Sequence, residues 1–143
     1  MQIFEIPFQL ISIEGDGYHI MIDGHINGKQ ASFLVDTGAS RTVFDLEGIR
    51  KFVPEPEFLE NERLSTGLGT NEMPSMVVEI DNLGFGNLKI IYYTAIAIDL
   101  KHVHLSYQSL GLPAIDGVLG GDLLAQYRCV INYKTRKIKF YTN

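Results

Sequence analysis

The chain has 143 residues, a length that suits one domain with its own core and is too short for two. Apolar residues make up 45% and charged residues 20% of the sequence, a composition that excludes a disordered chain. The net charge is −5, which argues against a nucleic-acid partner. The basic residues are dispersed except near the C-terminus, where their alternation around an expected turn indicates a solvated hairpin: Lys134, Arg136, Lys137 and Lys139. We expect a single domain over residues 1–143.

The single cysteine, Cys129, excludes an intrachain disulfide. Its apolar neighbours Val130 and Ile131 indicate a buried, unreactive thiol rather than a nucleophile. No apolar stretch approaches the roughly 20 residues that a membrane-spanning helix needs. The first residues lack the basic segment and apolar core of a secretory leader. We therefore expect a cytoplasmic protein with no membrane partner.

The first expected element is a hairpin over residues 18–35, in which apolar and polar side chains alternate. Asn27-Gly28 is typical of the type I′ turn that joins the two strands of such a hairpin. A short strand is expected at 42–44, and a short helix follows over 46–52, capped by Asp45 and ended by prolines.

Short runs of β-branched and aromatic residues, separated by Gly, Asn and Asp, continue through the second half and favour an all-β fold. Residues 101–113 give no clear signal. The expected elements are a second hairpin with arms at 64–70 and 76–80 and a glycine-rich tip, a long strand at 88–98, a short helix at 121–127 and a closing hairpin at 129–141.

The most informative stretch is the apolar run 33–35, which is followed directly by Asp36 and a turn that contains a glycine. A lone carboxylate is costly to bury, because it must find partners or take up a proton. Asp36 is therefore either a turn-forming residue or an acid tuned for chemistry, and we favour the second interpretation. For Asp116, which also precedes a glycine, we favour a structural role in the turn.

Residues 34–40 have the sequence Leu-Val-Asp-Thr-Gly-Ala-Ser, and Val-Leu-Gly follows at 118–120 just before the helix expected at 121–127. In this order and spacing the two motifs resemble those of retropepsin-like aspartic peptidases, the clan of pepsin and the retroviral proteases. The resemblance extends over about residues 18–141. It implies a closed acid-protease-type β-barrel protomer with one or two short helices.

The resemblance also implies roles for individual residues. Asp36 would be the catalytic acid. The residues that would support the active-site loop are Thr37, Gly38, Ala39, Ser40, Val118, Leu119 and Gly120. The flap that would cover and bind the substrate comprises Thr66, Gly67, Leu68, Gly69 and Thr70.

Peptide hydrolysis by this route needs two carboxyl groups that share one proton, one to activate water and one to polarise the carbonyl. The chain carries a single Asp-Thr-Gly turn. The resemblance and this count together imply a twofold homodimer in which each protomer contributes Asp36. We thus expect an aspartic endopeptidase that acts on a peptide or protein substrate and needs no cofactor.

Two departures from the family pattern keep a second function open. Retroviral relatives place Arg then Asn after the apolar-apolar-Gly motif, where the arginine braces the loop, whereas this chain has Gly121 and Asp122. The expected flap also lacks the tip sequence of the retroviral enzymes. The alternative is a non-catalytic module that keeps the fold for peptide binding or dimerisation.

Two further patterns are assigned no ligand. His102 and His104 have strand spacing, but two histidines without a third nearby ligand do not make a metal site. Residues 67–69, Gly-Leu-Gly, are not followed by Lys-Ser or Lys-Thr, so they do not predict a nucleotide loop.

Overall fold

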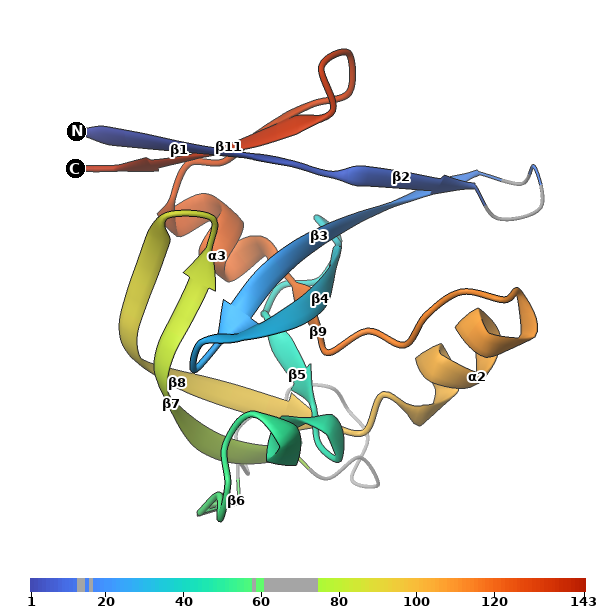
Figure 1. Cartoon of the computed structure of the whole chain (residues 1–143), viewed down its shortest axis with the longest axis vertical. Coiled ribbons are helices and arrows are strands. Elements are labelled where there is room, and N and C mark those ends of the chain that lie inside the picture. The colour runs from blue at the N-terminus through green and yellow to red at the C-terminus, as the bar shows by residue number, and fades with distance from the viewer. Residues whose placement is uncertain (13–14, 16, 58, 61–74) are drawn as a thin grey trace.

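The computed structural model describes residues 1–12, 15, 17–57, 59–60 and 75–143. In this part of the chain β-strands dominate, with two short α-helices and one 3-10 helix (Figure 1). The strands are β1 (Gln2–Pro7), β2 (Gln9–Ser12), β3 (Tyr18–Ile26), β4 (Lys29–Val35), β5 (Val43–Asp45), β6 (Leu59–Glu60), β7 (Ser75–Phe85), β8 (Leu88–Ile98), β9 (Gly117–Leu119), β10 (Val130–Asn132) and β11 (Lys137–Thr142). The helices are η1 (Gly48–Lys51), α2 (Lys101–Ser109) and α3 (Gly121–Gln126).

Eight strands form one sheet in the order β2-β3-β4-β9-β5-β8-β7-β6. An additional pairing between β3 and β7 joins the sheet to itself and closes a barrel of six strands. Most neighbours are antiparallel, but β4 runs parallel to β9 with Val35 opposite Leu119. The fold is therefore the closed all-β barrel that the sequence predicts.

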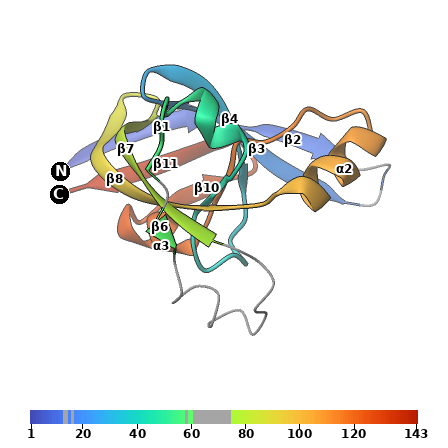
Figure 2. The same ribbon diagram turned by 90° about the horizontal axis from the view of Figure 1, so that it is seen from below.

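The two ends of the chain pair with each other in a separate three-stranded sheet of order β1-β11-β10. Gln2 lies opposite Thr142, and the register continues to Pro7 opposite Lys137. In both views the two termini lie side by side, at the end of the molecule opposite to α2 (Figures 1 and 2). The terminal strands thus find a partner within their own chain.

The barrel interior is filled by aromatic and β-branched side chains from all parts of the sequence. Phe33 lies at its centre, with ring centroids 5.8 Å from Phe44 and 5.1 Å from Phe85, both in edge-on geometry. Phe85 in turn stacks on Phe140, which brings β11 over the barrel. Such aromatic contacts stabilise a core beyond the area that they bury, so the terminal sheet is fixed to the barrel by the core.

Several predicted elements are confirmed. The hairpin β3-β4 turns at Asn27 and Gly28, both with positive φ, as a type I′ turn requires. The long strand predicted over 88–98 has those bounds in β8. The helix after Gly120 is α3, and the closing hairpin is the β10-β11 pair.

The helix expected over 46–52 is instead the four-residue 3-10 helix η1. The first arm of the second hairpin, expected at 64–70, lies outside the described residues; within them, β7 pairs with β6. Residues 101–109, which gave no signal, form α2, so His102 and His104 lie on a helix and not on a strand. None of the described helices is long and apolar enough to cross a membrane.

Candidate active site

Asp36 stands at the point where two parallel strands end together. It follows the last residue of β4 directly, and its backbone N–H donates to the carbonyl of Leu119 at the end of β9 (3.0 Å). The two motifs that the sequence singled out, 34–40 and 118–120, are therefore brought together, as the predicted site requires. The carboxylate is carried by buried strands to the rim of the barrel.

The turn after Asp36 is closed by its own side chain. The backbone N–H of Gly38 donates to Oδ1 of Asp36 (2.9 Å), and that of Ala39 donates to the Asp36 carbonyl (3.2 Å). Asp36, Thr37, Gly38 and Ser40 are all exposed in the single chain. The loop thus presents its carboxylate to solvent, on a surface that a ligand or a second molecule could cover.

The start of α3 supports this loop from behind. The backbone N–H groups of Gly121 and Asp122 donate to the carbonyls of Ala39 (2.7 Å) and Ser40 (3.1 Å). These donors come from the first turn of the helix, which has no intrahelical partners for them. Gly120 is packed so closely that an added Cβ would lie 2.6 Å from the Arg41 backbone. The Val-Leu-Gly motif and α3 therefore fix the loop by backbone contacts.

A hydrogen-bonded pair, buried Thr42 and exposed Asp122, completes the support. Thr42, only 1% exposed, donates its backbone N–H (2.8 Å) and its hydroxyl (2.7 Å) to Oδ1 of Asp122. The same hydroxyl accepts from the buried N–H of Gly120 (3.0 Å). Because the arginine of retroviral relatives is absent, Asp122 and Thr42 provide a brace within one chain. Sequence reasoning missed both residues, although an acid in the first turn of a helix is a recognisable N-terminal signal.

We expect Thr42→Val to weaken this brace. Valine keeps the shape of the side chain but removes the hydroxyl, so the Gly120 N–H loses its acceptor and Oδ1 of Asp122 loses one donor. We expect this to cost about 2 kcal/mol in unfolding free energy. Urea denaturation at matched protein concentration measures the loss. Thr42→Ser, which keeps the hydroxyl, is the control and should lose no more than about 1 kcal/mol. Equal stability of the valine variant and the native protein would contradict this role.

A hollow of about 430 Å³ opens beside the carboxylate. It is bounded by the ends of β3 and β4, by the loop at Asp36 and by β10, and its lining combines apolar and polar side chains: Tyr18, His19, Ile20, Leu34, Val35, Asp36, Thr37, Ile131 and Tyr133. A hollow that combines apolar walls with polar groups is a candidate ligand site.

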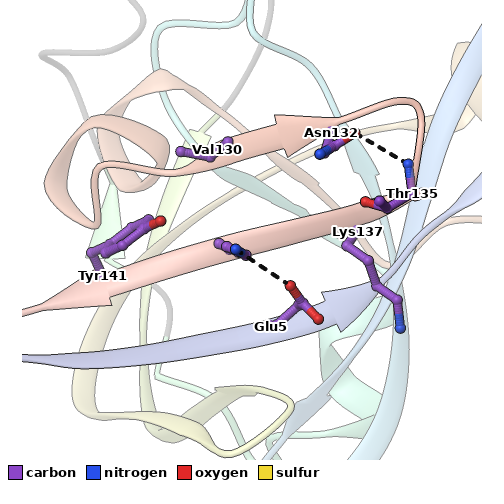
Figure 3. Close-up of a pocket in the computed structure, with 7 residues that line it drawn as sticks. Glu5, Val130, Asn132, Thr135, Lys137 and Tyr141 are labelled. Carbon is purple, nitrogen blue, oxygen red and sulfur yellow. Dashed lines mark hydrogen bonds and ion pairs between the residues drawn. The ribbon is translucent and has the colours of Figure 1, made fainter.

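A second hollow, of about 290 Å³, lies on the outer face of the terminal sheet (Figure 3). Its only acid is Glu5, which is paired with Lys139 at 3.8 Å. Asn132 is held by the Thr135 N–H at 3.1 Å. The Asn132 contact stabilises the β10-β11 turn.

Asp116, directly before Gly117, serves the fold. Asp116 accepts the backbone N–H of Ser32 (2.8 Å) and an ion pair from Lys51 (3.3 Å). These contacts tie the start of β9 to β4 and to η1. They agree with the structural interpretation of Asp116.

The other candidates are placed as follows. The predicted flap, Thr66–Thr70, lies outside the described residues. Nε2 of His104 donates a hydrogen bond to the carbonyl of Ile115 (2.8 Å). The described residues contain no group of three or more metal-ligating side chains. Burial raises the pKa of the Cys129 thiol to about 12, which makes it a poor nucleophile at neutral pH.

The fold is shared with solved aspartic proteases. A retropepsin-like aspartic protease from Rickettsia conorii matches with a TM-score of 0.57 and 19% identity, over 98% of this chain and 93% of that one. The retroviral protease-like domain of Ddi1 from Leishmania major matches with a TM-score of 0.54 and 15% identity, over 81% of this chain and 82% of that one. At these identities the likeness shows a retropepsin-like fold.

The family relationship is also visible in the sequence. The family model described as aspartyl protease matches residues 22–123, a range that contains Asp36, Thr42, Gly120 and Asp122. No curated protein matches the chain significantly. The chain belongs to the aspartyl protease family, as its motifs predict.

Proposed function

We propose that the protein is an aspartic endopeptidase that acts as a homodimer, with Asp36 of each protomer forming one catalytic pair. The observation that carries this proposal is the position of Asp36. The carboxylate is exposed at the joined ends of β4 and β9, on a loop held by α3. One exposed carboxylate on this supported loop in each chain is half of the pair that peptide hydrolysis needs.

In the proposed dimer the two carboxyl groups share one proton, because two like charges at close range cannot both ionise. The ionised carboxyl takes a proton from water, and the protonated one donates a hydrogen bond to the scissile carbonyl. Water then attacks the carbonyl carbon, and proton transfer to the leaving nitrogen completes cleavage. No cofactor takes part in these steps.

The remaining site residues take supporting roles in this proposal. Thr37 and Ser40, exposed beside Asp36, face the region that a second protomer would cover, and Gly38 and Ala39 shape the turn. The supporting motif behind the loop is Val118, Leu119 and Gly120. The flap residues Thr66, Gly67, Leu68, Gly69 and Thr70 would close over an extended peptide bound as an added strand.

A subunit-mixing experiment tests the shared site. Native and Asp36→Asn proteins are mixed in varying proportions at constant total concentration, allowed to exchange subunits, and assayed for peptide cleavage. If two Asp36 residues make one site, mixed dimers are inactive and activity falls as the square of the native fraction, to about one quarter in an equal mixture.

A linear fall to one half, with subunit exchange verified by mass spectrometry, would show that one chain suffices and would overturn the dimeric mechanism. Complete lack of Asp36-dependent cleavage in a broad peptide library would instead favour the alternative, a peptide-binding or dimerisation module.

A further inference from the structure

A histidine and a tyrosine from distant parts of the chain meet beside the catalytic aspartate. His19 is exposed on β3 and lines the same hollow as Asp36. Its Nδ1 lies 2.7 Å from the hydroxyl oxygen of Tyr107, which is carried on α2 and is only 5% exposed. The two rings are tilted by 52°, with centroids 5.9 Å apart. The helix that the sequence did not predict thus reaches the site through this pair.

The hydrogen bond determines which imidazole nitrogen carries the proton. Burial, and then the negative charge of Asp36, raise the pKa of Tyr107, so its phenol keeps its proton. Among the described residues, Nδ1 of His19 is the hydrogen-bond partner that the structure gives to this hydroxyl. Because a buried hydroxyl proton needs an acceptor, we assign the phenol as donor to Nδ1. A neutral imidazole then carries its proton on Nε2, for which the described part of the chain offers no hydrogen-bond partner.

The surroundings make this donor distinctive. The other lining residues of the hollow are apolar, carry hydroxyl groups or, at Asp36, carry a carboxylate. His19 is therefore the single side chain of the lining with a nitrogen donor. A ligand oxygen in the hollow can accept a hydrogen bond from this N–H, and the other possible donors of the lining are the hydroxyl groups of Tyr18, Thr37 and Tyr133.

We propose that His19, oriented by Tyr107, determines specificity by binding a side-chain oxygen of the substrate. The preferred substrates carry a carboxylate or amide side chain, from Glu, Gln, Asp or Asn, close to the scissile bond. His19 contacts the substrate in this scheme, whereas Tyr107 is a positioning residue that acts through the histidine. The inference rests on the proposed function, since it assigns a substrate class to the same site.

A digest of a proteome-derived peptide library tests the proposal. Native protein should cut preferentially where Glu, Gln, Asp or Asn occupies one fixed position near the scissile bond. In His19→Phe, which keeps a ring but has no N–H, this enrichment should disappear. For two matched peptides with Gln or Met at that position, the kcat/KM of the Gln peptide divided by that of the Met peptide should be about five- to tenfold lower in His19→Phe than in the native protein, the effect of one hydrogen bond.

Two further variants separate specificity from mere structure. His19→Gln retains a nitrogen donor and should restore part of the Gln-over-Met preference. Tyr107→Phe keeps the buried ring but loses the hydroxyl, and should lower the preference by about two- to fivefold in native protein and not at all in a His19→Phe background. An unchanged cleavage profile in His19→Phe would overturn the proposal, even if that variant were less stable.

Binding to Asp36→Asn protein distinguishes this inference from the proposed function. Fluorescence polarisation with the Gln and Met peptides reads the subsite without cleavage. A Gln preference that disappears when His19→Phe is added to the Asp36→Asn protein, together with no cleavage by the native protein, would support the subsite and reject the enzyme. Cleavage without any role of His19 would do the reverse, and absence of both binding and cleavage would overturn both.

Discussion

Asp36→Asn protein is expected to lose peptide cleavage by at least about a thousandfold, because an amide can neither activate water nor share a proton. The fold should persist, since the asparagine side-chain oxygen can still accept the Gly38 N–H that Oδ1 of Asp36 accepts at 2.9 Å. Circular dichroism, urea denaturation and sedimentation should therefore match the native protein, while a fluorogenic peptide assay detects the loss.

The matched control is Asp116→Asn, at the aspartate that precedes Gly117 at the start of β9. Asparagine can still accept the Ser32 N–H there, and the lost ion pair to Lys51 is largely exposed on the lysine side, where such pairs contribute only about 0–1 kcal/mol. We expect this variant to keep cleaving. Similar residual cleavage by both variants would point to a contaminating protease and remove the support for catalysis at Asp36.

Gly120→Ala is expected to have the largest effect on stability of any single methyl group added near the site. Its Cβ would lie 2.6 Å from both the carbonyl carbon and the oxygen of Arg41, and 2.9 Å from the Ala39 carbonyl oxygen. Backbone atoms cannot rotate away as a side chain can, so α3 or the loop must shift. We expect a loss of about 3 kcal/mol in unfolding free energy, with lower activity because the same loop holds Asp36.

Gly121→Ala, one residue further, is the comparison. There the added Cβ would lie 3.3 Å from the nearest backbone oxygen, and alanine favours the helix by up to about 1 kcal/mol over glycine. This variant should stay within about 1 kcal/mol of the native protein by urea denaturation at equal concentration. If both alanine variants were equally stable, tight packing at Gly120 would not be what fixes the loop.

Local patterns predicted much of this fold correctly. The type I′ turn at Asn27-Gly28, the strand Leu88–Ile98 and the meeting of the motifs around Asp36 and Gly120 all carry their information in adjacent residues or in a family motif. The helix α2 carries no such information. Val103, Leu105 and Tyr107 alternate as they would in a strand, and no side chain caps the helix at Leu100.

The parts of the site that could not be predicted depend on contacts between distant segments. Thr42 and Asp122 are 80 positions apart in the chain, and His19 and Tyr107 are 88 apart. Each residue alone is an ordinary polar side chain in a β-rich sequence. Their pairing follows only from the closure of the barrel and the placement of the helices.

The brace between Thr42 and Asp122 also bears on how two protomers would meet. Contacts within one chain already support the loop, so in the proposed dimer less of it remains to be ordered when a partner arrives. Association of preformed surfaces avoids the entropy loss that ordering a flexible segment would add. In the proposed dimer, assembly therefore joins two loops that already have much of their shape, and less of the association free energy is offset by ordering them.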